Sequence, residues 1–190
     1  MPVFHLLAGS NGAGKSTYAD DVLIPVTGLP FINADVIAAQ TWADPEPHAY
    51  EAAQFAEALR RQSLNLGQSF ISETVFSHES KVALVSDASA LGYIVNLHVV
   101  IVPVGLTVRR VHDRVRLGGH RVDEDKIRGR YERLWDYVAQ AIRIADVTEV
   151  LDNSNAEEPF RVCAAFTKGV VTGPVEWPTW APSPLVALTT

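Results

Sequence analysis

One short run of residues near the start of the chain constrains its fold more than any other feature. Residues 9–16 read G-S-N-G-A-G-K-S, a full match to the pattern of a phosphate-binding loop. An apolar run at residues 3–8 precedes the loop, and residues 15–24 follow it without Gly or Pro. A strand, a loop and a helix therefore fall in the required order, which disfavours a glycine-rich turn of no function. The pattern predicts the first strand–loop–helix unit of an α/β protein.

The composition of this loop predicts a site for a nucleoside triphosphate. Glycines let consecutive backbone N–H groups converge on phosphate oxygens, and the N-terminus of the next helix adds partial positive charge. Lys15 is expected to reach the β and γ phosphates, and Ser16 to supply a hydroxyl to Mg²⁺. The expected ligands are ATP and Mg²⁺, bound by Gly9, Ser10, Asn11, Gly12, Ala13, Gly14, Lys15, Ser16 and Thr17, together with Arg110.

Length and composition predict a single domain. A chain of 190 residues that is 47% hydrophobic can form one compact domain with a core, but it is too short for two full ones. The one cysteine, Cys163, cannot form an intrachain disulfide, and the chain opens without a secretory signal, so a cytoplasmic protein is expected. The uncharged residues 88–108 contain Gly92 and Pro103, and they fit a helix end, a buried strand and a turn better than a membrane span.

Apolar runs alternate with helical patterns along the chain, which is typical of βαβ units and a parallel sheet. Strands are predicted at residues 3–8, 29–33, 69–72, 94–102 and 147–151. The spacing of apolar residues predicts helices over 48–66 and 123–145. Residues 160–171 fit either a helix or a late strand. The proline-rich end of the chain, about residues 172–190, is expected to pack on the domain surface.

Two acidic residues follow strands whose carboxyl ends are expected to face the ligand crevice. Asp35 follows the second predicted strand, where a carboxylate can accept the proton of an acceptor hydroxyl. The alternative, that Asn33 or Asp35 only caps the next helix, is less favoured because the position itself lies at the crevice. Glu73 ends the third strand, where it is suited to act on the water of a bound metal or on the acceptor. Caps formed by Ser72 and Thr74 are an equally good interpretation of that segment.

Positive charge is concentrated in one segment of an otherwise acidic chain. The net charge of -6 argues against a general nucleic-acid binder, because a protein needs an excess of Lys and Arg over a broad surface to neutralise a phosphate backbone. Nine of the 16 Lys and Arg residues nevertheless lie within residues 109–133: Arg109, Arg110, Arg114, Arg116, Arg121, Lys126, Arg128, Arg130 and Arg133.

This segment predicts a helical, arginine-rich lid over residues 105–133, hinged at Gly118 and Gly119 with His120 at its tip. Phosphoryl transfer spreads negative charge over oxygens that guanidinium groups can contact bidentately. Charge-rich helices are more often solvated faces, an interpretation that fits Arg109, Lys126 and Arg133. It fits less well the set Arg114, Arg116, Arg121, Arg128 and Arg130.

Together with the loop, three further segments make the chain resemble the zeta-toxin family of P-loop kinases. They read F-I-N-A-D, I-S-E-T and R-V-R-L-G-G-H-R-V-D-E-D-K-I-R-G-R-Y, and the resemblance extends from about residue 3 to residue 153. It implies a three-layer α/β sandwich of the P-loop kinase type with a five-stranded parallel core sheet. The toxins that define the family place an arginine close to the position of His120, and they are longer than this chain.

The same resemblance implies an activity, residue roles and a partner. The better-studied family members transfer the γ-phosphoryl group of ATP to a sugar hydroxyl of UDP-N-acetylglucosamine and are held inactive by a small antitoxin protein. Lys15 and Ser16 match the phosphate and metal residues, Asp35 the base, Glu73 the acid that ends the third strand, and Arg114 and His120 positions in the lid. The full set of catalytic candidates is Lys15, Asp35, Glu73, Arg114, His120, Arg121 and Arg130.

Two other functions are compatible with a phosphate-binding loop. An ATP hydrolase that acts as a conformational switch on a protein partner is disfavoured, because no Gln or Asp stands out to orient water and the arginines are supplied in cis. A nucleic-acid end kinase or an RNA-binding module is disfavoured by the acidic balance of the chain and by the lack of a basic sequence interleaved with aromatic residues. The expected partner is a small-molecule acceptor, with neither nucleic acid nor membrane. Residues 43–47, A-D-P-E-P, fit an acceptor-side loop or an ordinary turn.

Overall fold

The computed structural model describes residues 1–116 and 123–190. Within these residues one sheet of seven strands has the order β2-β3-β1-β4-β5-β6-β7. The strands are β1 (Val3–Gly9), β2 (Phe31–Ile32), β3 (Phe70–Thr74), β4 (Ile94–Ile101), β5 (Val147–Asp152), β6 (Arg161–Thr167) and β7 (Val170–Val171). The helices are α1 (Lys15–Tyr18), α2 (Ile24–Thr27), α3 (Ala34–Thr41), α4 (Ala49–Asn65), α5 (Ser80–Ala90), α6 (Val104–Arg116), α7 (Glu124–Ile142) and α8 (Ser183–Val186).

The predicted parallel core of five strands is confirmed, because β2, β3, β1, β4 and β5 all pair in parallel. The sheet continues beyond this core with β6 and β7, which pair antiparallel to their neighbours. Residues 160–171, whose sequence fitted either a helix or a late strand, therefore form a hairpin. Lys168 and Gly169 both have positive φ between its strands, as the tightest hairpin turns require.

The second strand is shorter than the predicted range 29–33 and spans only Phe31–Ile32. The residues on either side of the strand, Pro30 and Asn33, explain why it is short. Pro30 has no N–H for a ladder, although its carbonyl accepts a hydrogen bond from the Ile71 N–H at 2.9 Å. Asn33 has already turned to cap α3, since its side chain accepts hydrogen bonds from the backbone N–H groups of Asp35 and Val36.

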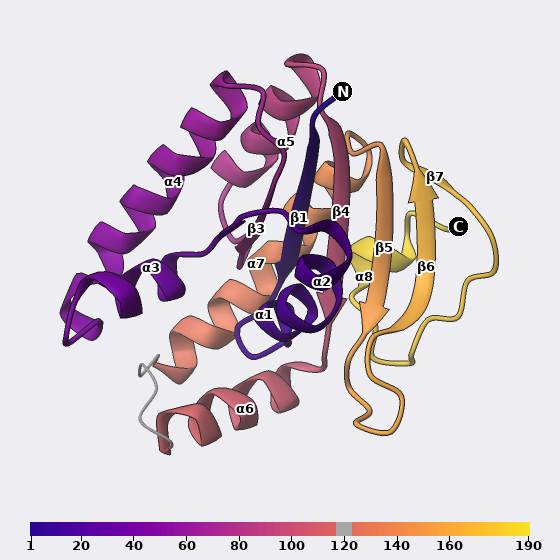
Figure 1. Cartoon of the computed structure of the whole chain (residues 1–190). Helices are drawn as coiled ribbons and strands as arrows, with labels where there is room; N and C mark the ends of the chain where they lie inside the picture. The colour runs from indigo at the N-terminus through magenta and orange to yellow at the C-terminus, as the bar shows by residue number, and fades with distance from the viewer. Residues whose placement is uncertain (117–122) are drawn as a thin grey trace.

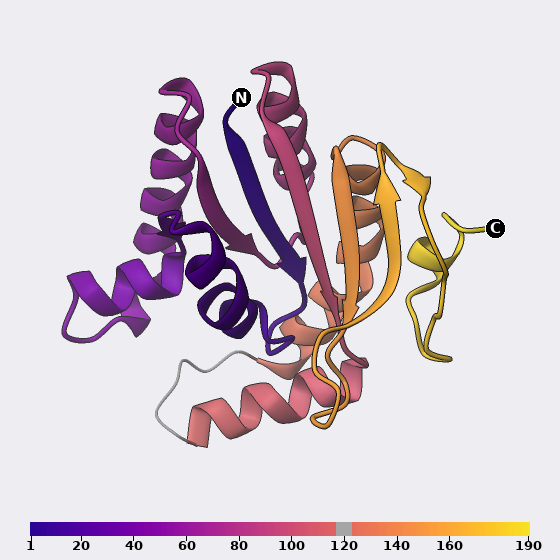
Figure 2. The same ribbon diagram turned by 45° about the vertical axis from the view of Figure 1, so that its right-hand side comes forward.

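Helices cover the two faces of the sheet unequally, as Figures 1 and 2 show. On one face, α4, α5 and α7 pack against alternate residues of the central strands, Phe4 and Leu6 among them. On the other face, Leu7 and Val100 pack under the helical segment that follows the phosphate-binding loop. Strand β4 is buried along most of its length, as expected for a parallel strand covered on both faces.

The segment after the loop is helical from α1 to α2, with a π-helical stretch, η1 (Ala19–Leu23), between them. It ends at Gly28, which adopts the left-handed conformation. The predicted long helices are also present, as α4 and α7. Helix α7 begins with a cap from Asp123, whose carboxylate accepts a hydrogen bond from the Asp125 N–H at 2.9 Å.

The C-terminal residues return to the main core. Leu185 of the short helix α8 is fully buried, and α8 contacts α7. Trp177, Trp180 and Leu188 pack against the same core cluster. The Trp177 indole N–H also donates a hydrogen bond to the Thr189 hydroxyl at 3.0 Å. A search of the described helices finds none that is both long and apolar enough to span a membrane.

Candidate active site

The phosphate-binding loop connects the carboxyl end of β1 to the first turn of α1, at the edge of the sheet where the parallel strands end (Figure 1). Backbone geometry explains two of its glycines. Gly14 has φ +98, and an added Cβ would collide with the side-chain amide of Asn153. Gly9 has φ +148, and a Cβ there would collide with the carbonyl oxygen of Val100. The loop therefore lies directly against β4 and the residue that follows β5.

Lys15 lies inside this loop. Its ammonium donates a hydrogen bond to the carbonyl oxygen of Ser10 at 3.0 Å, and the residue is 6% exposed. Burial lowers the pKa of the Lys15 ammonium, while the charges of Glu73 and Asp35 act in the opposite direction. Lys15 is thus a buried cation within the electrostatic influence of both acidic residues that the sequence analysis selected.

Ser16 and Glu73 are in direct contact. The Ser16 hydroxyl donates a hydrogen bond to a carboxylate oxygen of Glu73 at 2.7 Å. The parallel pairing of β1 with β3 sets Leu7 opposite Glu73, which brings the end of β3 beside the loop. Hydroxyl and carboxylate oxygens are the hard donors that Mg²⁺ prefers. This pair therefore has suitable chemistry to hold Mg²⁺ together with phosphate oxygens and water.

The cap of α3 belongs to Asn33, so the Asp35 carboxylate is not used for that purpose. Asp35 is in the first turn of α3, and its side chain is 79% exposed. An Arg114 guanidinium nitrogen of α6 lies 3.8 Å from a carboxylate oxygen of Asp35. The Asp35 carboxylate is thereby exposed to solvent, with an arginine of the predicted lid as its neighbour.

Arg110 lies beside the loop, but its guanidinium points at backbone. It donates to the carbonyl oxygen of Asn153 at 2.9 Å and to that of Gly12 at 3.4 Å. Burial lowers the pKa of the Arg110 guanidinium. Arg110 therefore joins α6 to the loop and to the end of β5.

Asn153 is a residue of this site that the sequence analysis did not select. Its side-chain amide donates a hydrogen bond to the Ala13 carbonyl oxygen at 2.8 Å, and its N–H donates to the Ile101 carbonyl oxygen at 3.0 Å. The available signal was its position directly after a strand of the parallel sheet, the same signal that selected Asp35. Asn153 holds the loop against the ends of β4 and β5.

The remaining loop candidates differ in exposure. The Ser10 hydroxyl is buried and lies 2.9 Å from the Thr107 hydroxyl of α6, Asn11 is half-buried, Ala13 is buried and Thr17 is exposed on α1. The Ser10–Thr107 contact attaches the start of the loop to α6.

The other arginines of residues 109–133 do not all point toward the phosphate-binding loop, as a lid built from them would require. Arg116 lies 3.6 Å from Asp113 and Arg128 lies 2.7 Å from Glu124, each within its own helix, as in a solvated surface. Arg130 is half-buried on α7. The candidates His120 and Arg121, and the hinge glycines Gly118 and Gly119, lie outside the described residues.

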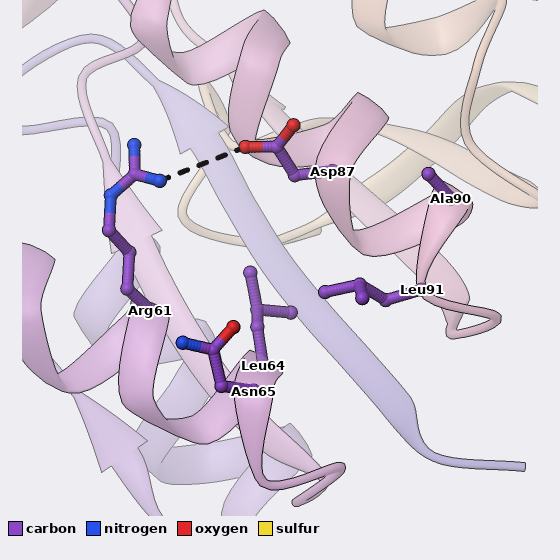
Figure 3. Close-up of a pocket in the computed structure, with 6 residues that line it drawn as sticks. All are labelled: Arg61, Leu64, Asn65, Asp87, Ala90 and Leu91. Atoms are coloured by element: carbon purple, nitrogen blue, oxygen red, sulfur yellow. Dashed lines mark ion pairs between the residues drawn. The ribbon is translucent and has the colours of Figure 1, made fainter.

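Two observations concern the rest of the molecule. Within residues 1–116 and 123–190, no group of three or more His, Cys, Asp or Glu side chains is arranged to hold a metal ion. A pocket of about 320 Å³ lies between α4 and α5, away from the loop, and its lining includes Arg61 and Asp87, which form an ion pair of 3.8 Å (Figure 3). Leu64 and Leu91 contribute its apolar lining, and no candidate residue belongs to it.

A comparison with protein families assigns this chain to one of them. Residues 45–161, more than half of the chain, match the model of the zeta toxin family. The chain belongs to the zeta toxin family. The matched region contains Glu73 and Arg114, whereas the phosphate-binding loop and Asp35 precede it. No curated protein matches the chain significantly.

Solved structures similar to this zeta toxin family member are P-loop proteins of low sequence identity. A structure of the PezAT toxin–antitoxin system of Streptococcus pneumoniae matches with TM-score 0.59 and 16% identity, over 87% of this chain and 72% of that one. The AvrRxo1-ORF1:AvrRxo1-ORF2 complex with sulphate ions matches with TM-score 0.66 and 17% identity, over 90% and 60%. Shikimate kinase from Acinetobacter baumannii in complex with shikimate matches with TM-score 0.56 and 15% identity, over 82% and 86%.

These likenesses establish the P-loop kinase fold that the sequence predicted, and the family resemblance is confirmed. The chain spans 60% of the length of the AvrRxo1 chain that it matches. Family membership together with this fold supports a nucleotide-dependent phosphotransferase. The individual roles of the site residues stay predictions.

Proposed function

We propose that this zeta toxin family member transfers the γ-phosphoryl group of ATP to a hydroxyl of a small molecule. The observation that carries the proposal is the meeting of Lys15, Ser16, Glu73 and Asp35 at the carboxyl ends of three adjacent parallel strands. One ammonium, one hydroxyl and two carboxylates arranged in this way can bind a metal–nucleotide complex on one side and an acceptor hydroxyl on the other.

In this proposal the loop from Gly9 to Ser16 binds the phosphates through its backbone N–H groups, and Lys15 exchanges the Ser10 carbonyl for a β or γ phosphate oxygen. Ser16 and Glu73 would hold Mg²⁺, which offsets negative charge on the phosphate oxygens when bound. Burial of Lys15 strengthens its attraction to phosphate, because a charge in a low-dielectric site is poorly screened.

Asp35 is proposed to accept the proton of the acceptor hydroxyl. As the O–H bond breaks, the acceptor oxygen forms a bond to the γ phosphorus, and the bond from that phosphorus to the β–γ bridging oxygen breaks. The products are a phosphorylated acceptor and ADP, with the proton on Asp35. The exposed Asp35 carboxylate suits this step, because it is not engaged in the α3 cap.

Arginines are proposed to stabilise the transferred group. Arg114, now 3.8 Å from Asp35, would turn to the γ-phosphoryl oxygens when ATP binds. Arg130, His120 and Arg121 are proposed as further basic groups of the lid. Arg110 is proposed to act on the nucleotide by supporting the loop at Gly12.

The proposed acceptor is a sugar nucleotide, with UDP-N-acetylglucosamine as the first candidate. Family membership supports this choice. The segment between Asp35 and Phe70, which includes α3, the 3₁₀ turn η2 (Glu46–His48) and α4, is the proposed acceptor side. An antitoxin protein is the proposed regulatory partner, since one similar structure is a toxin–antitoxin system. The cytoplasm is the proposed location.

The test is ATP turnover with Mg²⁺, first without an acceptor and then with a panel headed by UDP-N-acetylglucosamine, following both ADP and phosphorylated product. We expect ADP release that depends on the acceptor and equals the product formed. Stimulation by another hydroxyl compound would keep the reaction and replace the substrate. Steady hydrolysis that no acceptor alters would contradict the kinase and favour an ATP hydrolase that acts as a switch.

A further inference from the structure

A buried arginine of α4 is hydrogen-bonded to β3, the strand that carries Glu73. Arg60 of α4 is 5% exposed, although it carries a full positive charge. One terminal nitrogen of its guanidinium donates to the Ser72 hydroxyl at 3.2 Å, and the other donates to a Glu57 carboxylate oxygen at 3.0 Å. Buried charges of this kind are costly unless they are paired and hydrogen-bonded. Arg60 is therefore a specific feature of the fold rather than part of a solvated helix face.

Ser72 connects this arginine to both acidic residues. Its hydroxyl donates to the Ile32 carbonyl oxygen at 2.7 Å while it accepts from Arg60, and the residue is fully buried. Ile32 directly precedes Asn33, which caps α3 and so orients the first turn that carries Asp35. Ser72 itself directly precedes Glu73 on β3. The Arg60–Ser72 contact thus lies one residue before Glu73 in the sequence. Through the hydrogen bond from Ser72 to the Ile32 carbonyl oxygen, it is also connected to the residues that lead into α3 and Asp35.

The other end of Arg60 is fixed by a second set of charges. Glu57 also accepts from the Lys81 ammonium of α5 at 3.2 Å, and Arg61 lies 3.3 Å from its other oxygen. Burial alone raises the pKa of the Glu57 carboxyl, but the hydrogen bond from Arg60 and the charge of Lys81 outweigh it and hold that pKa below its usual value. The cluster ties α4 and α5 to the edge of the sheet at β2 and β3.

We infer that Arg60 is a positioning residue of the phosphotransferase site, which acts through Ser72 to fix Glu73 for Mg²⁺ and the Asn33 cap for Asp35. The inference rests on the proposed function in assigning Glu73 to the metal. It adds a residue on α4 whose hydrogen bond to Ser72 decides how firmly the metal-binding carboxylate is held. Residues that orient a ligand of a metal commonly change metal affinity when they are replaced.

The test compares Arg60→Lys, Arg60→Met and Ser72→Ala with the wild-type chain. The neighbouring variant Arg61→Met is the matched control, because Arg61 also pairs with Glu57 but its side chain is 57% exposed and does not reach Ser72. The readout is the Kd of ADP by titration calorimetry with and without Mg²⁺, together with the melting temperature of each variant. ADP is used because it binds the site whatever the acceptor proves to be.

We expect Mg²⁺ to strengthen ADP binding in the wild type and in Arg61→Met to the same degree. Ser72→Ala and Arg60→Met should lose about tenfold or more of this Mg²⁺ effect, whereas their Kd for metal-free ADP stays near the wild-type value. Arg60→Lys should lose less, since it keeps the charge at Glu57 but not the two-pronged contact. If Arg60→Met does not fold, Ser72→Ala and Arg60→Lys still decide the question.

The outcomes separate this inference from the proposed function. A full Mg²⁺ effect in Ser72→Ala and Arg60→Lys would overturn the positioning role and leave the kinase proposal intact. An equal loss of the Mg²⁺ effect in Arg61→Met would also overturn it, since the loss would then result from removing any positive charge from α4 and not from breaking the contact with Ser72. Absence of any Mg²⁺ effect in the wild type would instead contradict the metal role of Ser16 and Glu73, and this inference with it.

Discussion

Replacing Asn153 by alanine tests how the phosphate-binding loop is held. The substitution removes the amide that donates to the Ala13 carbonyl oxygen at 2.8 Å, and it leaves that carbonyl without this partner beneath the loop. An unsatisfied buried acceptor costs about 1–3 kcal/mol. For a domain of this size, a loss of 1 kcal/mol lowers the melting temperature by about 2–4 °C, so a decrease of about 2–12 °C is expected.

The same variant should bind ATP more weakly, because the loop must hold its backbone N–H groups in one arrangement to bind phosphate. The assays are thermal melting and ATP titration. Asn155→Ala is the matched control, since Asn155 is exposed and its side chain accepts only a local hydrogen bond from the Glu157 N–H. Unchanged melting and unchanged ATP affinity in Asn153→Ala, or equal losses in both variants, would refute the assignment of Asn153 as the support of the loop.

Three further predictions concern stability and reactivity away from the loop. Burial, with the nearby His98 as a second cause, lowers the pKa of His5 to about 4, so its ring stays neutral in the fold while the unfolded chain takes up a proton near pH 6.5. Stability that is present above pH 6.5 should therefore decline as the pH falls toward 4, by about 1–2 kcal/mol after allowance for solvent screening, and urea unfolding of wild type and His5→Asn across this range measures it. Leu185→Ala should lower the free energy of unfolding by about 2–5 kcal/mol, because Leu185 is fully buried under α7, and an unchanged denaturation midpoint would contradict this. Burial raises the pKa of the Cys163 thiol to about 11, so a thiol reagent at pH 7 should label the native chain far more slowly than the chain in urea.

The parallel core was predictable because its signals are local. Each strand is an apolar run between turn residues, and the loop G-S-N-G-A-G-K-S fixes the direction of the first βα unit. The rule that carboxyl ends of parallel strands share one edge then placed Asp35 and Glu73 near the loop. In the structure Glu73 contacts Ser16 of the loop, and the charges of both acids act on the pKa of Lys15.

The supports of the site were not predictable, because they join residues that are distant in sequence. Asn153 contacts Ala13 across 140 positions, and no local pattern distinguishes it from any other polar residue after a strand. Arg60 is one of two adjacent arginines on α4, and only the packing of α4 on β3 shows that it is buried beside Ser72. The shortened β2 reflects a competition at Asn33, where capping α3 replaced a further strand residue.

The charge cluster was the least specific signal. Arg114 reaches Asp35, whereas Arg110 binds backbone and Arg116 and Arg128 pair within their own helices. Composition placed these arginines in one segment, but the direction of each side chain follows from helix phase and from the neighbours that each one meets.

The most direct test of the account is phosphoryl transfer by Asp35→Asn beside the wild type, with the acceptor that the panel identifies and with ATP affinity measured in parallel. Asn keeps the size of the side chain and removes its ability to take a proton, so the account predicts that transfer is abolished while the Kd for ATP stays nearly unchanged. Transfer by Asp35→Asn at a rate near that of the wild type would contradict the account and remove Asp35 from the mechanism.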